Sequence, residues 1–335
     1  MSIGYVPSVS IALAMAIITM FCFGSWPATQ RKCGDWRFEA WYLDFAWSIV
    51  AGTFLVGLLL GGVSPSGWSA NNYLHMLSSA HTSAIVWALF AGIVWGAGNF
   101  LLAVAIRLTG LALAFPIGIG LALALGTSLA YVTNPSATAH PMFLFIGLVL
   151  VLLAIGANAL AHTTKHAHIP TDNLKLGVAV AVICGVLIAL FPSPFNFAFD
   201  NGLTGEAGAL YMAIGALIIN AFLVPYYMRH PIVPNQKPIG LFEYGRAKLT
   251  WHLWAALGGL IWATGMVFQL VVANQPKFSV AIAYTLGQGA VMVAAIWGIF
   301  VWKEFAGAPK RAHQYLALMF LLFIVGIIFI AKATG

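Results

Sequence analysis

The segment LALAFPIGIG (residues 111–120) returns in altered form as VAIAYTLGQG (residues 280–289), at an offset of 169 residues. The two segments share the pattern Ala-x-Ala-(Phe/Tyr)-x-x-Gly-x-Gly. A second pair, AGIVWGAG (91–98) and GGLIWATG (258–265), aligns at an offset of 167. Two aligned pairs at nearly constant offset indicate that the chain consists of two related halves. The aligned residues include Phe115 and Tyr284, Gly118 and Gly287, Gly120 and Gly289, and Trp95 and Trp262.

The composition excludes a water-soluble globular fold. Of the 335 residues, 61% are hydrophobic and only 7% are Asp, Glu, Lys or Arg, whereas about a quarter of the residues of a soluble domain are charged. A chain with so few charged residues cannot form the polar surface of a water-soluble protein. We therefore predict an all-α membrane protein. The three cysteines, Cys22, Cys33 and Cys184, lack the spacing of a disulfide framework or of a zinc site.

Ten apolar runs are long enough to cross a bilayer, which takes about 20 helical residues. The first run lacks the basic start of a signal peptide and is therefore predicted to be a membrane span. No stretch is predicted to be a strand. The predicted spans are 8–29, 38–62, 84–105, 110–132, 142–161, 175–198, 207–227, 251–273, 279–301 and 314–333.

The basic residues are divided unequally between the two ends of the predicted bundle. Of the 15 Lys and Arg residues, only Lys277 and Lys332 fall at the end that holds the two termini. Lys and Arg accumulate in cytoplasmic loops, so both termini are expected outside. The net charge of +7 is explained by this orientation and does not indicate a nucleic-acid partner.

Each half holds five predicted spans, an odd number, so the second half is expected to lie inverted in the membrane relative to the first. We assign residues 1–168 to the first five-helix repeat and residues 169–335 to the second. Proline-bearing stretches, GSWPA (24–28) and FPSPFN (191–196), close the first helix of each half. Inverted repeats are typical of secondary transporters, in which a site at the midplane opens alternately to either face.

Asp44 is the only carboxylate well inside a predicted span. A charge at the bilayer centre costs about 2.5–3.5 kcal/mol on insertion scales, and less toward the cytoplasmic end, where Asp44 is expected. A carboxylate in an apolar site can bind and release a proton near neutral pH. Asp44 is therefore the candidate that couples proton movement to solute movement. The alternative is a structural acid paired with Arg37 or hydrogen-bonded at the membrane interface.

Uncharged polar and aromatic side chains recur within the spans. Amides and hydroxyls bind neutral polyols or ureas through many small hydrogen bonds, and aromatic faces stack on C–H surfaces. Each amide alone also fits a helix-to-helix hydrogen bond, but the set predicts a shared polar cavity. The absence of buried Arg or Lys argues against a phosphorylated or carboxylated solute. The candidates are Trp26, Trp95, Asn99, Asn196, Trp262, Gln269, Tyr284, Thr285 and Gln288.

The paired glycine-rich segments superficially resemble a dinucleotide-binding loop, but they follow no strand and lie in apolar runs. Small residues allow membrane helices to approach closely, so packing is the predicted role. The proline is also a candidate helix break that frees carbonyl groups toward a cavity. The residues concerned are Pro116, Gly118, Gly120, Gly287 and Gly289.

HTTKHAH (162–168) contains three histidines at a spacing that can bind a metal. A solvated loop explains this segment better, and we predict neither a metal nor a cofactor. Glu304, at the inner end of the ninth span, is expected to pair with Lys303 or Lys310, and a role as a gate is the alternative.

On these residues the chain resembles the drug/metabolite transporter superfamily, within it the bacterial sugar uptake permeases (glucose/ribose porters and rhamnose–proton symporters) and the plant ureide permeases. GSWPA (24–28) and YLDF (42–45) look like the G-T-W-P-A and Y-L-D-Y of ureide permeases. WGAGN (95–99) and LGTSL (125–129) look like the W-G-x-G-N and G-T-S-L of sugar porters. The resemblance covers nearly the whole chain. In the ninth span, the positions of ureide-permease Q, W-G and E are held by Gln288, Trp297, Gly298 and Glu304.

The resemblance implies Trp26, Asp44, Asn99 and Gln288 as functional positions. The chain departs from the family pattern in two ways. Met266 stands where relatives often repeat the asparagine of the Gly-Asn pair, and the long central loop of ureide permeases is absent.

We therefore predict a secondary carrier that takes up a small neutral polar solute, a sugar or a sugar-like molecule, with protons as the coupling ion. The alternatives within transport are a ureide or nucleobase permease and a drug or metabolite exporter. A membrane-embedded enzyme is the alternative of another class, but no nucleophile–base set or metal cluster lies at one depth. We expect a monomer or homodimer in the cytoplasmic (inner) membrane of a bacterium.

Overall fold

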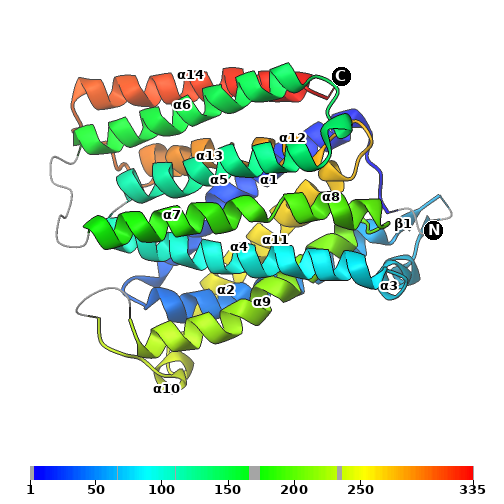
Figure 1. The fold of residues 1–335 in the computed structure, drawn as a ribbon. Helices are drawn as coiled ribbons and strands as arrows, with labels where there is room; N and C mark the ends of the chain where they lie inside the picture. The colour runs from blue at the N-terminus through cyan, green and yellow to red at the C-terminus, as the bar shows by residue number, and fades with distance from the viewer. Residues whose placement is uncertain (1–3, 66, 110, 166–173, 232–235, 335) are drawn as a thin grey trace.

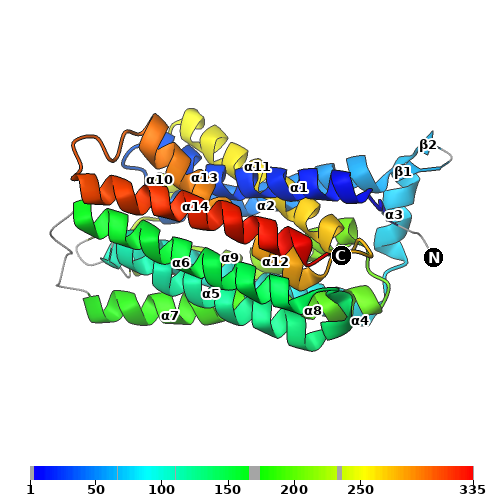
Figure 2. The same cartoon turned by 90° about the horizontal axis from the view of Figure 1, so that it is seen from above.

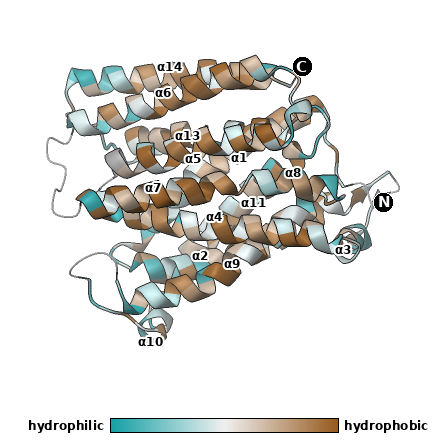
Figure 3. Ribbon diagram, in the orientation of Figure 1, coloured by the Kyte–Doolittle hydropathy of each residue, from teal (hydrophilic) through white to brown (hydrophobic). Residues whose placement is uncertain are grey.

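The computed structural model is a bundle of ten helices of membrane-spanning length within its described part (Figure 1). The structure describes residues 4–65, 67–109, 111–165, 174–231 and 236–334. All ten predicted spans are present, with boundaries shifted by a few residues. Hydrophobic residues cover the middle of the helices and hydrophilic residues gather toward their ends (Figure 3).

The spans follow one another up and down the bundle and are joined by short elements. The spans are α1 (Val9–Gln30), α2 (Phe38–Gly61), α4 (Thr82–Thr109), α5 (Leu111–Thr133), α6 (Pro141–Lys165), α7 (Leu174–Leu190) with α8 (Ser193–Asp200), α9 (Gly205–Arg229), α11 (Leu249–Ala273), α12 (Val280–Gly287) with α13 (Ala290–Ile296) and a π-helical turn (Trp297–Val301), and α14 (Lys310–Lys332). The joining elements are β1 (Val63–Ser64), β2 (Gly67–Trp68), α3 (Ala70–Ser78), α10 (Leu241–Gly245) and the 3-10 turns Arg31–Cys33 and Pro135–Ala137.

Both ends of the chain lie at the same end of the bundle, which we call the terminal end (Figures 1 and 2). The Tyr5 N–H donates to the carboxylate of Glu206 at 2.8 Å. The His140 N–H donates to the carbonyl oxygen of Ala333 at 3.2 Å. The opposite end, where α1 and α6 finish, is called the distal end below.

The prediction that the chain contains no strand is wrong at one place, the antiparallel pair β1–β2 at the terminal end. Val63 pairs with Trp68 and Ser64 with Gly67. Gly67 has φ of 111°, a value that a side chain tolerates poorly and glycine adopts freely. The hairpin is two residues deep on each side, too short to produce an alternating sequence pattern.

The prolines act differently from one span to another. α1 continues through Pro27 and α5 continues through Pro116, so α5 has no break at the proline. The sixth span is interrupted at Phe191–Pro192, between α7 and α8. The ninth span is interrupted at Gln288–Gly289, between α12 and α13.

Helices in corresponding places of the two halves make corresponding contacts. α4 packs on α9 and α7, and α11 packs on α2 and α1. A Cβ atom on Gly92 of α4 would lie 1.9 Å from the Met212 carbonyl oxygen of α9, and one on Gly259 of α11 would lie 2.6 Å from the Phe45 carbonyl oxygen of α2. Gly92 and Gly259 are 167 residues apart, and so are Phe45 and Met212. Small residues thus permit the close crossings on which the bundle depends.

Candidate functional site

A cavity of about 390 Å³ lies inside the bundle. Its lining comes from both halves: from α1, α2, α4, α5 and α6, and from α7, α11, α12, α13 and the π-helical turn. Ligand pockets span roughly 300–1,000 Å³, so this volume suits a small solute.

Stacked tryptophans form one wall of the cavity. Trp95 of α4 and Trp262 of α11 have ring centroids 4.2 Å apart. Phe23 stacks on Trp262 at 5.5 Å. Trp26 also lines the cavity and packs on Phe45 at 4.7 Å. Trp95 and Trp262 are the aligned tryptophans of the two halves, so the halves meet at this pair.

Five amide side chains line the same cavity: Gln30, Asn99, Asn158, Gln269 and Gln288. The Asn99 amide donates to the Tyr42 hydroxyl at 2.9 Å, which fixes its orientation. The side-chain oxygens of Asn158 and Gln269 are buried without a hydrogen-bond partner.

Asn158 was not among the residues singled out from the sequence. The available signal is an amide inside the apolar run LLAIGANAL (152–160). The neighbouring His162, assigned to a solvated loop from its sequence, lies in α6 and lines the cavity. Its ring packs on Phe305 at 5.0 Å. The other two histidines of that segment lie outside the described residues.

Charged side chains surround the cavity at the distal end. Arg31, Arg107 and Glu304 line it, and both arginines are exposed, so the cavity leads to this end of the bundle. Arg31 donates to the Glu304 carboxylate, so Glu304 pairs with Arg31 rather than with Lys303 or Lys310. Two exposed cations therefore border the cavity at this end, whereas no Arg or Lys is buried among the described residues.

Arg107 falls between the predicted spans 84–105 and 110–132, but in the structure it forms part of the last turn of α4. Its guanidinium lies 5.6 Å from the ring centre of Phe38. Among the described residues, no carboxylate forms an ion pair with Arg107. Its charge is therefore available to the cavity.

The terminal end of the bundle is closed by contacts between α5 and the spans that carry α8 and α12. The hydroxyls of Thr127 and Thr285 are 2.9 Å apart, and the Tyr284 hydroxyl donates to the Ala122 carbonyl oxygen at 3.1 Å. None of these residues lines the cavity. Tyr284 and Thr285, predicted to bind solute, thus serve in this structure to hold the terminal end shut.

Asn196, another predicted solute ligand, has the same closing role. Its amide donates to the Ala130 carbonyl oxygen at 2.8 Å and to the Thr133 hydroxyl at 2.6 Å. It lies in α8 and does not line the cavity. Of the nine predicted ligands, the structure therefore brings six together: Trp26, Trp95, Asn99, Trp262, Gln269 and Gln288.

Asp44 lies outside the cavity, between α2, α10 and α11. Its carboxylate accepts from the Tyr244 hydroxyl at 2.5 Å and lies 2.6 Å from Nδ1 of His252. Trp36 covers the cluster, with its ring 4.9 Å from that of His252. Burial, together with the hydrogen bond to Asp44 and its charge, raises the pKa of Tyr244. Tyr244 therefore stays a neutral phenol that donates to Asp44.

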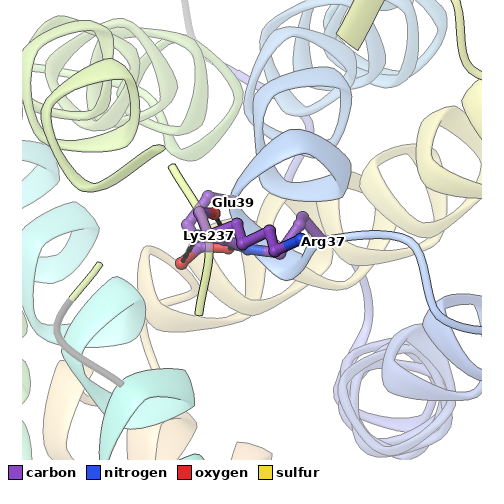
Figure 4. A network of polar contacts seen from close by, with 3 residues as sticks. All are labelled: Arg37, Glu39 and Lys237. Carbon is purple, nitrogen blue, oxygen red and sulfur yellow. Dashed lines mark hydrogen bonds and ion pairs between the residues drawn. The ribbon is translucent and has the colours of Figure 1, made fainter. Parts of the chain in front are cut away.

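Arg37, the partner considered for Asp44, is bound elsewhere. Its guanidinium donates to both carboxylate oxygens of Glu39, at 2.9 and 2.8 Å, and also to the carbonyl oxygen of Lys237 (Figure 4). Glu39 lies in the first turn of α2, where a negative charge is favoured by the helix dipole. The arrangement ties the start of α2 to the segment between α9 and α10.

The paired glycines allow close packing around the cavity. A Cβ atom on Gly118 would lie 3.2 Å from Leu102, and one on Gly287 would lie 3.2 Å from Oε1 of Gln269. One on Gly289 would meet the Met20 sulfur at 2.2 Å, whereas Gly120 has no described atom within 4 Å of that position. Gly287 thus leaves room for the amide of Gln269 beside the cavity.

No group of three or more His, Cys, Asp or Glu residues in the described part of the chain is placed to hold a metal ion. Ten apolar spans around a partly polar cavity define an integral membrane protein with an internal solute-sized site.

Comparison with known proteins gives the family. The model of the sugar transport protein family matches residues 69–333, and the chain belongs to this family. Ureide permease 1 of Arabidopsis thaliana is 20% identical over 97% of both chains. The glucose uptake protein GlcU of Bacillus subtilis (strain 168) is 26% identical over 48% of both chains. A crystal structure of a protein with 15% identity matches with a TM-score of 0.61, over 97% of this chain and 99% of that chain, which shows a shared fold.

The protein is therefore a transporter of small solutes and not an enzyme, since its relatives are permeases and uptake proteins. The resemblance to sugar and ureide permeases drawn from the sequence motifs is confirmed.

Proposed function

We propose that this transporter takes up a small neutral polar solute, a sugar or a sugar-like molecule, together with protons. The observation that carries the proposal is the cavity, whose lining combines five amides with the contacting tryptophans Trp95 and Trp262. Amides satisfy the hydrogen bonds of hydroxyl or N–H groups, and aromatic faces accept the C–H surface of a sugar ring. The bacterial relative named as a glucose uptake protein supports this solute class and a bacterial cytoplasmic membrane.

Alternating access between two inverted five-helix repeats is the proposed mechanism. It is supported by the way aligned residues occupy matching places. Gly98 of α4 approaches Ile188 of α7, and its aligned partner Gly265 of α11 approaches Phe23 of α1. The rings of the aligned residues Trp95 and Trp262 are in contact, with centroids 4.2 Å apart, which supports a pseudo-two-fold axis near this pair. The proposed boundary at residues 168 and 169 lies outside the described residues.

In the described state, the cavity leads to the distal end and the terminal end is closed. If the positive-inside rule sets the orientation, the distal end is cytoplasmic and this state faces inward. The opposite state requires the α5–α12 contacts of Thr127, Tyr284 and Thr285 to separate. Those three side chains then become available to a solute that enters from the terminal end.

We propose the Asp44–His252 pair as the proton-coupling group. Asp44 lies in a membrane span, with its carboxylate 2.6 Å from Nδ1 of His252 and hydrogen-bonded to the Tyr244 hydroxyl. A proton that binds here weakens the link between α2 and α11, two helices whose packing must change if the halves rock. Glu304 is the competing candidate, because it is the carboxylate that lines the cavity in the described part of the chain.

The experiment is uptake into proteoliposomes across an imposed proton gradient, with D-glucose, D-ribose, L-rhamnose, allantoin and uracil as solutes. We expect accumulation of a sugar that collapses when a protonophore is added. Accumulation of allantoin or uracil alone would replace the sugar by the second candidate function, a ureide or nucleobase permease. The full-length match to Ureide permease 1 favours that candidate. Efflux of hydrophobic cations in place of uptake would support an exporter.

A further inference from the structure

We propose that Asn158 of α6 and Gln269 of α11 are the hydrogen-bond acceptors for the solute. The carrier then selects solutes that present at least two hydrogen-bond donors, either hydroxyl or amide N–H groups. This inference rests on the proposed function and names the chemistry that the cavity recognises.

The two amides are buried, line the cavity and lack partners at their oxygen atoms. Asn158 is 8% exposed and Gln269 is 4% exposed. The Asn158 Oδ1 and Gln269 Oε1 atoms make no hydrogen bond within the protein. Burial of an unpaired polar atom is costly, and native proteins avoid it unless another molecule supplies the partner. Both residues line the cavity, from which a solute can reach their amide groups.

Other buried amides in the bundle have a structural role, because they form hydrogen bonds within the protein. Asn196 donates to Ala130 and Thr133, and Asn99 donates to Tyr42. Asn220 also has an unpaired oxygen, but its amide nitrogen donates within α9 and the residue does not line the cavity. Among these five, only Asn158 and Gln269 combine an unpaired side-chain oxygen with a place in the cavity lining.

The surroundings indicate the shape of the solute. Gly287 lacks the side chain that would crowd Oε1 of Gln269. The Trp95–Trp262 pair offers an apolar face to the same cavity. A compact ring with donors around its edge and C–H bonds on its face matches this arrangement. D-glucose and allantoin both carry such donors, as hydroxyl and N–H groups respectively.

The first experiment measures solute recognition in proteoliposomes. The competitors are the monodeoxyfluoro analogues of D-glucose and the N-methyl derivatives of allantoin, because fluorine and N-methyl groups cannot donate. We expect at least one analogue to inhibit the wild type about tenfold less well than its parent, as the loss of a strong hydrogen bond predicts. In the Asn158→Leu variant, the parent solute is expected to inhibit about as weakly as that analogue inhibits the wild type. The parent and the analogue should then inhibit the variant equally.

The control for this experiment is Thr53→Val, in α2. The Thr53 hydroxyl donates to Ile49 and Val50 of its own helix, and the residue does not line the cavity. Its variant is expected to keep the wild-type discrimination. If both variants keep that discrimination, Asn158 does not bind the solute and the inference is overturned.

The second experiment needs no transported solute. Asn158→Leu and Asn196→Leu make the same chemical change at two buried asparagines, one unpaired at its oxygen and one bonded to two partners. Without ligand, we expect the first variant to unfold in detergent at the wild-type temperature or above it, and the second to unfold at a lower temperature. Equal destabilisation would show that Asn158 has a structural role. If the wild type transports neither D-glucose nor allantoin, the proposed solute class is wrong. The comparison of unfolding temperatures still decides the role of Asn158 in that case.

Discussion

Replacement of Gly92 by alanine tests whether the α4–α9 crossing holds the cavity wall in place. The added Cβ would lie 1.9 Å from the Met212 carbonyl oxygen, whereas real Cβ contacts stay above 3.0 Å. The two helices must therefore part by at least 3.0 − 1.9 = 1.1 Å. The obstacle is a backbone atom, which cannot rotate away. A gap of roughly 0.5–1 Å already forfeits a quarter to a half of each dispersion contact along the crossing.

We expect Gly92→Ala to destabilise the protein by about 2–3 kcal/mol, at the upper part of the range for overpacked cores. The gain in helix propensity, about 0.4–1 kcal/mol, offsets only part of this cost. Thermal unfolding in detergent, followed by tryptophan fluorescence, measures the change. The matched control is Gly156→Ala in α6, where a Cβ meets no described atom within 4 Å. Equal unfolding temperatures for the two variants would refute the reasoning. Weaker solute binding should accompany the loss of stability, because α4 carries Trp95 and Asn99.

Four further substitutions test separate parts of the site. Asp44→Asn is expected to stop proton-driven accumulation of the solute, while exchange of solute across the membrane continues. Glu304→Gln is expected to keep proton-driven accumulation. If Glu304→Gln stops accumulation and Asp44→Asn keeps it, the coupling group is Glu304 in the cavity wall. Arg107→Gln is expected to abolish any preference for D-glucuronate over D-glucose as an inhibitor of uptake. The substitution removes a cation that lines the cavity and forms no ion pair with a carboxylate among the described residues. An unchanged preference would show that Arg107 does not contact the solute. Thr285→Val keeps the side-chain shape but removes the bond to Thr127, so the population open at the terminal end should rise about fivefold, the effect of roughly 1 kcal/mol. Cysteine labelling at that end measures the rise, and a fall in labelling would contradict it.

The spans and their order could be predicted from the sequence. Lipid as solvent requires about 20 apolar residues per helix, so each span leaves a clear local signal. The inverted-repeat organisation that the segments 111–120 and 280–289 indicate stays a prediction. The sequence alignment pairs Trp95 with Trp262, and the two rings are in contact in the structure.

The face that each helix turns toward the cavity could not be predicted. In a membrane protein both the lipid-facing and the protein-facing sides of a helix are apolar, so periodicity does not separate them. Depth alone placed Thr285 and Gln269 in one group, yet one closes the terminal end and the other lines the cavity. The depth of Asp44 could be predicted, but its partners Tyr244 and His252 lie 200 and 208 residues further along the chain.

The sequence by itself determined that this protein crosses the membrane ten times, with its basic residues gathered at one end. Only the tertiary structure decided that Arg107 and Asn158 face the solute space and that Asn196 does not. The reason is physical. The free energy of insertion depends on the composition of a span, which is local, whereas a cavity depends on how several spans are rotated against each other. That rotation is set by close contacts, such as the approach of Gly92 to Met212, between residues far apart in the chain.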